Sequence, residues 1–303
     1  MSISVQNISK SYQKTVAVES ITFQVKEGEL FGLIGPDGAG KTTLFRILTT
    51  LLLANEGTAT VAGYDVVKDY KSIRKVVGYM PGKFSLYQDL TVEENLTFFA
   101  TIFGTTIEEN YDIIKEIYIQ IAPFKKRRAG KLSGGMKQKL ALCCALIHKP
   151  KVLFLDEPTT GVDPVSRKEF WEMLKRLQEK GITILVSTPY MDEAALCDRI
   201  ALIQKGSILK IDRPENIIDN YEKTIYDVQA KNTYQLIEDL KNYSSQYSVF
   251  AFGEYIHYID KNQNFNPVEL ENYLKQNNHQ DIVIKISKTT IEDVFMDLTN
   301  LNQ

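Results

Sequence analysis

The segment most informative about the fold of this chain is Gly35-Pro36-Asp37-Gly38-Ala39-Gly40-Lys41-Thr42. Residues 30–34 before it are β-prone, and leucine and isoleucine recur at helical spacing between positions 44 and 52 after it. In this order of strand, glycine-rich loop and helix, backbone N–H groups surround the phosphates of a nucleotide. A glycine-rich turn that only caps a helix is the alternative. The strand and the apolar helix on either side favour the phosphate-binding interpretation.

Each residue of this loop is a candidate for contact with a nucleotide. Lys41 is expected to reach the β- and γ-phosphates, and Thr42 is expected to ligate Mg²⁺. The predicted phosphate-binding residues are Gly35, Pro36, Asp37, Gly38, Ala39, Gly40, Lys41, Thr42 and Thr43.

A second candidate segment, Val152-Leu153-Phe154-Leu155-Asp156-Glu157, ends in two acids. Its unbroken apolar run suits a strand buried on both faces of a parallel sheet. At the end of such a strand, Asp156 would hold Mg²⁺ through water, and Glu157 would polarise the attacking water for in-line phosphoryl transfer. Adjacent acids at a strand end can also be solvated turn residues, and the phosphate loop favours the catalytic interpretation.

The third candidate segment is Leu132-Ser133-Gly134-Gly135-Met136-Lys137-Gln138-Lys139. The glycine pair is expected to lie at the start of a helix. The free N–H groups at this helix end could bind an anion. Because one triphosphate needs only one such loop, a second one implies that this helix end faces the nucleotide of another subunit. A serine N-cap on an ordinary helix is the alternative.

Composition narrows the classes of protein. The 303 residues contain 36 Lys and Arg against 38 Asp and Glu, a formal net charge of −2, so no global positive field argues for a nucleic-acid partner. The three cysteines fit neither a disulfide framework nor a metal-binding spacing, which indicates a reducing cytosolic compartment.

No segment approaches the roughly 18 uninterrupted apolar residues of a membrane span, and the N-terminus lacks a signal pattern. We therefore expect a chain that does not itself cross a bilayer.

The chain divides by composition near Pro214, beyond which Asn, Gln and Tyr become frequent and glycine nearly disappears. We predict an α/β domain over residues 1–215, with a β-rich start and a helical subdomain over about 85–148. A small α+β domain over residues 216–303 is predicted to follow, with a strand at 282–286 and a helix at 291–298 that begins after Thr289 or Thr290.

Residues 1 to about 215 resemble the ATP-binding subunits of ABC transporters almost continuously. The matched pieces are the phosphate loop, Leu132 to Met136 as the family signature, Asp156-Glu157, and Thr160-Gly161-Val162-Asp163 as the loop between two sites. Tyr12 matches the aromatic residue on which this family stacks adenine, although an aromatic at a strand end can also be a packing residue. Residues 290–295, Thr-Ile-Glu-Asp-Val-Phe, resemble the C-terminal extension of the drug- and polysaccharide-exporting branch.

This resemblance implies a fold, cofactors and partners. The fold is a P-loop NTPase (RecA-like) core, with the helical subdomain inserted between the phosphate loop and the Asp156 strand. ATP and Mg²⁺ are the implied cofactors, and two subunits meet head to tail, so that Ser133, Gly134, Gly135 and Asp163 of one subunit serve the nucleotide of the other. Nucleotide-driven closure of the pair drives export through separate transmembrane permease subunits. The chain would then be cytoplasmic and peripheral on the inner face of the cell membrane.

Two positions depart from the family pattern, and both belong to the catalytic machinery. Family members usually have Gln at position 82 and His at position 189, whereas this chain has Gly82 and Pro189. Asp37 also replaces a usual Asn. We predict that the chain's own site binds ATP but turns over slowly, while its signature serves a competent partner in a heterodimer. Alternatively, Gln88 or Tyr190 substitutes for the missing groups, both sites are active, and a homodimer suffices.

Other residues have weaker signals. One basic run extends from Lys125 to Arg128 and includes Lys131 nearby. It is expected to be either a solvated surface or a site that contacts anionic lipid. Four apolar residues follow position 82, and they either pack between subdomains or line the groove that receives a helix of the membrane subunit: Phe84, Leu86, Tyr87 and Leu90. His148 ends the helix after the signature and reads as a cap or a surface residue.

Two other functions fit the same motifs. One is a soluble ABC-type ATPase that acts on ribosomes or DNA without a membrane partner, but such relatives usually carry two cassettes or a long coiled-coil insertion. The other is a nucleotide-sensing regulatory subunit with negligible hydrolysis, which Gly82 and Pro189 favour.

Overall fold

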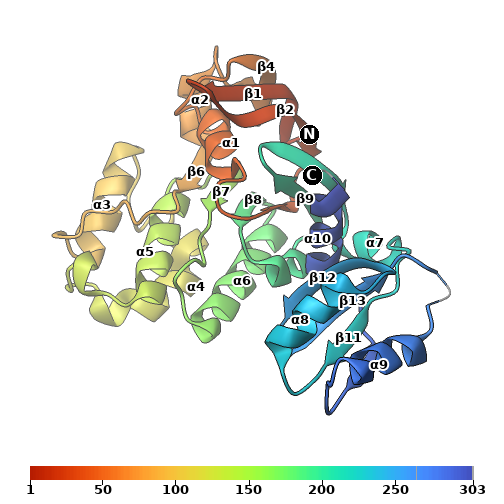
Figure 1. The fold of residues 1–303 in the computed structure, drawn as a ribbon. Helices are drawn as coiled ribbons and strands as arrows, with labels where there is room; N and C mark the ends of the chain where they lie inside the picture. The colour runs from red at the N-terminus through yellow and green to blue at the C-terminus, as the bar shows by residue number, and fades with distance from the viewer. Residues whose placement is uncertain (264, 302–303) are drawn as a thin grey trace. The chain divides into compact units, whose positions relative to one another are not determined.

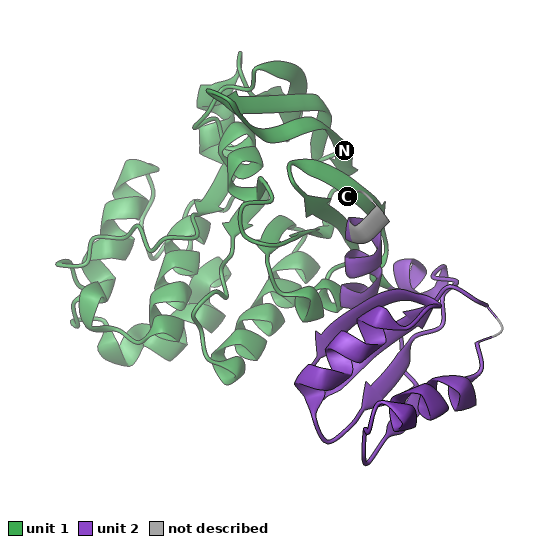
Figure 2. Ribbon diagram, in the orientation of Figure 1, with its two compact units in different colours: residues 1–214 green, residues 215–303 purple. Residues whose placement is uncertain are grey.

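The computed structural model describes residues 1–263 and 265–301. The chain forms two compact units, Met1–Pro214 and Glu215–Gln303 (Figure 2). Figure 1 shows the helices and strands of both units.

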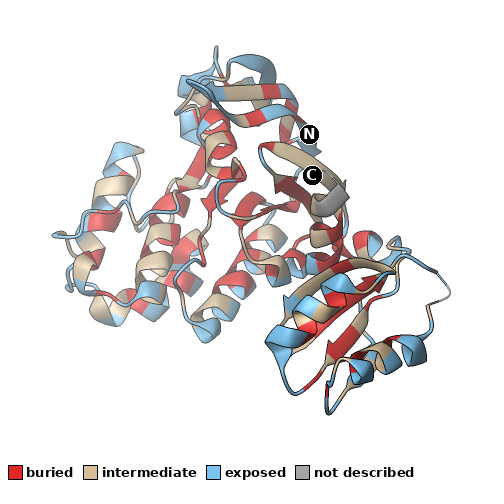
Figure 3. Cartoon of the chain, viewed as in Figure 1, coloured by how far each residue is buried: buried red, intermediate tan, exposed pale blue. Residues whose placement is uncertain are grey.

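A six-stranded sheet in the order β10-β9-β3-β8-β7-β6 forms the centre of the first unit. Neighbouring strands run parallel except β9 and β10, which are antiparallel. Every residue of β3, β7 and β8 is buried, as expected for short apolar runs covered on both faces (Figure 3). The strands are β3 (Leu30–Ile34), β6 (Val77–Met80), β7 (Val152–Asp156), β8 (Thr183–Thr188), β9 (Arg199–Gln204) and β10 (Ser207–Asp212).

A second, antiparallel sheet in the order β2-β1-β4-β5 forms the predicted β-rich start. Its strands are β1 (Ile3–Tyr12), β2 (Thr15–Val25), β4 (Glu56–Val61) and β5 (Tyr64–Asp65). Helix α1 (Lys41–Leu48) shares one apolar core with residues of both sheets. The helical spacing of leucine and isoleucine favours a helix to position 52, but α1 ends at Leu48, because Thr50 has a positive φ of 64°. The short helix α2 (Tyr70–Val76) leads into β6.

The predicted helical region contains α3 (Val92–Ile102), α4 (Tyr111–Ile121) and α5 (Gly134–Leu146), and both α3 and α4 pack on α5. Thr91 and Glu94 form a capping box that begins α3. Two 3₁₀ turns, η1 (Ala122–Phe124) and η2 (Ala129–Lys131), connect α4 to α5. Helix α6 (Pro164–Glu179) follows β7, and the 3₁₀ segment η3 (Met191–Leu196) follows β8.

The second unit is built on an antiparallel sheet in the order β12-β13-β11-β14. Its strands are β11 (Tyr226–Gln229), β12 (Gln246–Phe252), β13 (Tyr255–Asp260) and β14 (Val283–Ile286). Its helices are α8 (Thr233–Asn242), α9 (Pro267–Gln276) and α10 (Ile291–Leu301), while α7 (Pro214–Asp219) begins at the boundary between the units. Leucines of α8 and α9 pack against Val228, Ile256 and Tyr258 of the sheet. Within the described part of the chain, no helix has both the length and the apolar character that a membrane crossing requires.

Polar contacts tie the start of α10 to this sheet. Thr290 Oγ1 accepts from the N–H of Asp293 at 3.3 Å, and Asp293 Oδ2 accepts from the N–H of Thr290 at 2.7 Å. The other oxygen of Asp293 lies 2.5 Å from His257 Nδ1, and His257 Nε2 lies 3.1 Å from Asp227 Oδ1. The residues that resemble the exporter extension therefore have a structural task, which is to begin α10 and attach it to β13 and β11.

Candidate functional site

The ends of three neighbouring strands place the phosphate loop beside the two acids. Strands β3, β8 and β7 run parallel, and the register pairs Ile34 with Thr188 and Asp156 with Ser187. Because the carboxyl ends of parallel strands meet at one edge of the sheet, the loops that follow β3 and β7 converge there. Segments more than 100 residues apart in the sequence thus form one site.

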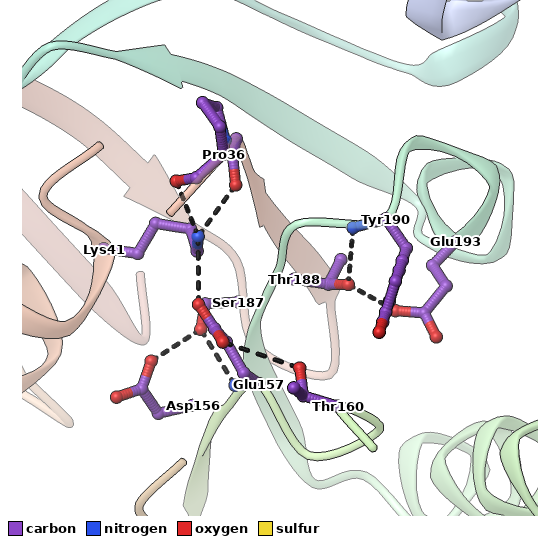
Figure 4. Close-up of polar contacts among 10 residues, drawn as sticks. Pro36, Lys41, Asp156, Glu157, Thr160, Ser187, Thr188, Tyr190 and Glu193 are labelled. Atoms are coloured by element: carbon purple, nitrogen blue, oxygen red, sulfur yellow. Dashed lines mark hydrogen bonds and ion pairs between the residues drawn. The ribbon is translucent and has the colours of Figure 1, made fainter. Parts of the chain in front are cut away.

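Lys41 joins the two halves of this site. Its side chain is only 3% exposed, and its ammonium donates to the carbonyl oxygens of Gly35 at 2.7 Å and Pro36 at 3.0 Å (Figure 4). The same Nζ lies 3.0 Å from Glu157 Oε1. The structure therefore brings Gly35, Pro36, Lys41 and Glu157 together, as the sequence predicts.

The conformation of the loop requires glycine at two positions. A Cβ at Gly35 would lie 2.1 Å from the carbonyl oxygen of Ile203. Gly40 has a φ of 103°, and a Cβ there would lie 2.3 Å from the carbonyl oxygen of Ala17. Gly40 is also the N-cap of α1 and supplies no side-chain hydrogen bond to it. The first N–H groups of α1 are therefore left for an anion.

The remaining loop residues differ in exposure. Asp37 and Gly38 are exposed, and Ala39 is buried. Thr42 and Thr43, both half-buried, lie in the first turn of α1. The side chain of Asp37 is therefore open to solvent.

Both acids are held by Ser187, a residue that we did not select from the sequence. Ser187 Oγ donates to Asp156 Oδ1 at 2.7 Å, and the N–H of Glu157 donates to both Ser187 O and Ser187 Oγ at 3.0 Å. Glu157 has a positive φ of 50°, an uncommon backbone conformation for a residue with a side chain. Burial and the negative charge of Asp156 raise the pKa of the neighbouring Tyr79 phenol to about 12, so this tyrosine stays neutral at physiological pH. The only sequence signal for Ser187 is its polar side chain at the end of an apolar strand.

The signature residues and Asp163 gather in a second place, where α5 meets α6. Ser133 is the N-cap of α5, and its Oγ accepts from the N–H of Met136 at 3.3 Å. Ser133 and Gly134 are exposed, and a Cβ at Gly135 would lie 2.7 Å from Ser166 Oγ. Asp163 is the N-cap of α6, and the hydrogen bond that it accepts from the N–H of Ser166 lowers its pKa.

Tyr12 ends β1 with its side chain 44% exposed, and Lys10 Nζ lies 5.9 Å from the centre of its ring. Tyr12 is therefore not a core packing residue, and adenine stacking stays a prediction. The hairpin between β1 and β2 reaches the phosphate loop, because Ala17 of β2 is the residue that Gly40 approaches.

The two departures from the family pattern lie near the acids. A Cβ at Gly82 would lie 3.0 Å from the backbone oxygen of Asp156 and 3.8 Å from Glu157 Cβ, so position 82 faces the acids without presenting a polar group. Pro189 directly follows β8. The two candidates to replace the missing side chains make other contacts. Gln88 lies against Gly130, and the ring of Tyr190 lies 4.7 Å from the Arg167 guanidinium.

Glu193 is a second buried residue that the sequence did not reveal. It accepts a hydrogen bond from the hydroxyl of Thr188 (Figure 4). It also accepts one from the hydroxyl of Thr159, and its Oε1 lies 3.6 Å from Arg167 Nε. Arg167 also pairs with Asp192 at 2.8 Å. The segment after β8 is thus fixed to the segment that follows Asp156 and Glu157.

A groove of about 420 Å³ lies between β6 and the helical region. Its lining includes Leu86, Phe99, Ile102, Phe103 and His148. Of the four apolar residues selected after position 82, only Leu86 lines it, while Tyr87 instead packs edge to face on Phe98. His148 is neither the predicted cap nor a surface residue: α5 has its C-cap at Ile147, and His148 is half-buried, stacked on Phe103 at 3.8 Å, with Nε2 3.1 Å from the carbonyl oxygen of Val77. Burial lowers the pKa of His148 and favours the neutral ring.

Comparison with known proteins identifies the family. The ABC transporter family profile matches residues 18–160. Nod factor export ATP-binding protein I of Mesorhizobium japonicum is 32% identical over 297 residues, which cover 96% of this chain and 85% of that protein. The chain belongs to the ABC transporter family.

Two further comparisons extend this finding. The probable multidrug ABC transporter ATP-binding protein YbhF of Escherichia coli is 47% identical over 201 residues, and these cover 66% of this chain but only 35% of YbhF. The chain thus spans about a third of that relative. A dimeric structure of the ATP-binding cassette MJ0796 bound to ADP and Pi superposes with a TM-score of 0.63 at 25% identity, covering 70% of this chain and 98% of that one. The expected α/β fold, a P-loop NTPase core, is confirmed.

Proposed function

We propose that this chain is the ATP-binding and ATP-hydrolysing subunit of an ABC exporter. One observation carries the proposal: Lys41, from the phosphate loop, lies 3.0 Å from Glu157 at the end of β7. A γ-phosphate held by Lys41 would therefore lie beside the carboxylate that can accept a proton from the attacking water. Residues 1–215 would be the ATP-binding domain and residues 216–303 an accessory domain.

Each side chain of the site has one task in this proposal. Lys41 binds the β- and γ-phosphates, the N–H groups of the loop and of α1 orient them, and Tyr12 stacks on adenine. The hydroxyl of Thr42 and the carboxylate of Asp156 are hard oxygen ligands that suit Mg²⁺. When bound, Mg²⁺ would neutralise charge on the phosphates. Glu157 orients and deprotonates the water.

The exposed signature supports a second ATP-binding subunit as partner. Ser133 and Gly134 are exposed, and Asp163 lies beside them at the start of α6. The start of α5 would bind the γ-phosphate of a nucleotide that the partner's phosphate loop holds. The cassette MJ0796, which shares the fold, forms a dimer with ADP and Pi.

The chain's own site is proposed to be slow, which favours a heterodimer. Gly82 faces Asp156 with no side chain, and Pro189 follows β8 with no donor, while Gln88 and Tyr190 are engaged elsewhere. Losing one oriented hydrogen-bonding group at a site of developing charge typically costs about 10²- to 10³-fold in rate, or roughly 3–4 kcal/mol. Two such losses would leave the competent turnover to the partner's site.

Export requires membrane subunits, and the groove beside β6 is the proposed place where one of them binds. Its apolar lining suits the buried face of an amphipathic helix. Its wall includes Met80 and Pro81, which lead directly to Gly82 at the acids, so a docked helix would contact the segment that reaches the site. The names of the relatives, a probable multidrug transporter protein and a Nod factor export protein, support a drug or a Nod factor as the exported substrate.

The deciding experiment compares two variants in the complex with the membrane subunits and the second ATP-binding subunit. Glu157→Gln disables the chain's own site, and Ser133→Arg blocks the site of the partner. We expect the second variant to abolish ATP hydrolysis and transport, and the first to reduce them less. Equal loss would overturn the division of labour. Full ATP hydrolysis without membrane subunits would favour the non-transport ATPase, and transport unaffected by both variants would favour a nucleotide-sensing subunit.

A further inference from the structure

Ser187 lies between the two acids, Asp156 and Glu157, and contacts both. It lies in β8, is fully buried, and stands opposite Asp156 in the register of β7 and β8. Its hydroxyl donates to Asp156 Oδ1 at 2.7 Å and accepts from the N–H of Glu157 at 3.0 Å. A single hydroxyl therefore uses its donor on one acid and an acceptor site on the other.

The bond to Glu157 acts on an uncommon backbone conformation. Glu157 has a φ of 50°, in the left-handed region, which costs free energy for a residue that carries a Cβ. Such a conformation persists only where the surroundings determine it. Here the N–H of Glu157 donates at 3.0 Å to both the carbonyl oxygen and the hydroxyl of Ser187. Ser187 thus fixes the turn that aims the Glu157 carboxylate at Lys41.

The next residue of β8 supports the other side of the same turn. Successive side chains of a strand point to opposite faces, so Thr188 turns away from the acids. Its hydroxyl donates to the buried carboxylate of Glu193, which also accepts from Thr159 Oγ1 at 2.8 Å. Because Thr159 lies two residues after Glu157, the segment that carries Glu157 is held before and after it.

We propose that Ser187 is a positioning residue of the nucleotide site, which orients the Asp156 carboxylate for Mg²⁺ and holds the backbone of Glu157. The segment after Glu157 is held separately, by the hydrogen bonds of Glu193 with Thr188 and Thr159. The inference rests on the function proposed above. Removing a group that orients a metal ligand typically lowers metal affinity about 10- to 100-fold.

The test measures binding of a fluorescent ATP analogue to the full chain, with Mg²⁺ titrated and in EDTA. Ser187→Ala removes the hydroxyl, and Ser187→Cys removes the strong donor while nearly keeping the volume. Thr183→Val is the matched control, because Thr183 is a buried residue of the same strand, whose Oγ1 accepts from the N–H of Gly28 at 3.1 Å, away from the acids. Thermal unfolding reports the structural cost of each substitution.

For both Ser187 variants we expect the Mg²⁺ concentration for half-maximal binding to rise about 10-fold, with affinity in EDTA within about twofold of wild type. Thr183→Val should lower thermal stability similarly and leave the Mg²⁺ requirement unchanged. An unchanged Mg²⁺ requirement in the Ser187 variants, or the same rise in Thr183→Val, would overturn the inference alone. Absence of nucleotide binding by the wild-type chain would overturn the proposed function as well.

Discussion

Lys41 Nζ lies 3.0 Å from Glu157 Oε1, so an ion pair links the loop after β3 to the turn after β7. The lysine is nearly buried, and its other contacts are the carbonyl oxygens of Gly35 and Pro36. The Lys41 ammonium thus has hydrogen-bond acceptors on several sides. It lies where it can also bind a phosphate group that the loop holds.

Lys41→Ala is expected to weaken ATP binding about 10- to 100-fold, because hydrogen bonds to charged groups contribute roughly 1.5–3 kcal/mol each. Fluorescence titration with an ATP analogue measures the change. Lys180→Ala is the control, since Lys180, the C-cap of α6, also forms an ion pair, at 2.9 Å with Glu116 of α4. Equal affinity of the two variants would contradict the assignment of Lys41.

Restoring the missing side chains tests the origin of slow turnover. The double variant Gly82→Gln with Pro189→His is expected to raise the ATPase rate of the chain's own site about 10²-fold or more, because it returns two oriented groups to the edge of β7 and β8. The rate is best measured in a complex whose other site is silenced by Ser133→Arg. Gly82→Met with Pro189→His controls for bulk at position 82, and it should recover less. A double variant no faster than wild type would mean that Gly82 and Pro189 do not limit hydrolysis.

A groove residue tests the proposed contact with the membrane subunit. Ile102 lines the groove and is 59% exposed, whereas Ile119 of α4 is 53% exposed and lies outside the groove lining. Ile102→Asp should therefore reduce co-purification with the membrane subunit, because a buried charge without a partner is costly. Ile119→Asp should leave co-purification intact, and both variants should bind ATP normally. Loss of co-purification in both variants, or in neither, would mean that the membrane subunit does not bind at this groove.

The sequence predicted those parts of the site that depend on local patterns. Gly35 to Thr42 and the run ending at Asp156 each carry their signal within about ten residues, and parallel strands necessarily bring their carboxyl ends together. Ser187 and Glu193 carry no such signal, because their partners Asp156 and Thr159 lie more than 30 residues away. The pattern of the sequence does not show which hydroxyl of β8 faces which acid.

Two errors about the fold have similar causes. The leucines at positions 51 and 52 continue the helical spacing of α1, but the left-handed backbone of Thr50 ends the helix, and no residue pattern announces a positive φ at threonine. His148 reads as a helix end from its neighbours, whereas its actual environment is the ring of Phe103, 45 residues earlier in the sequence. Both depend on tertiary context rather than on local preference.

The attachment of α10 to its sheet gives the last prediction. His257 is buried, and both of its ring nitrogens lie within 3.1 Å of a carboxylate, Asp293 on one side and Asp227 on the other. A ring nitrogen that carries a proton can donate to the carboxylate beside it. His257→Leu would leave the two buried acids without this polar ring between them. We expect this variant to lose about 3–5 kcal/mol of the free energy of unfolding of the second unit.

Urea unfolding of the full chain, followed by a probe in this unit, measures the loss. Lys275→Ala removes an exposed pair with Glu271 in α9 and should cost at most about 1 kcal/mol. A variant His257→Leu as stable as Lys275→Ala would show that the cluster does not hold α10 to the sheet.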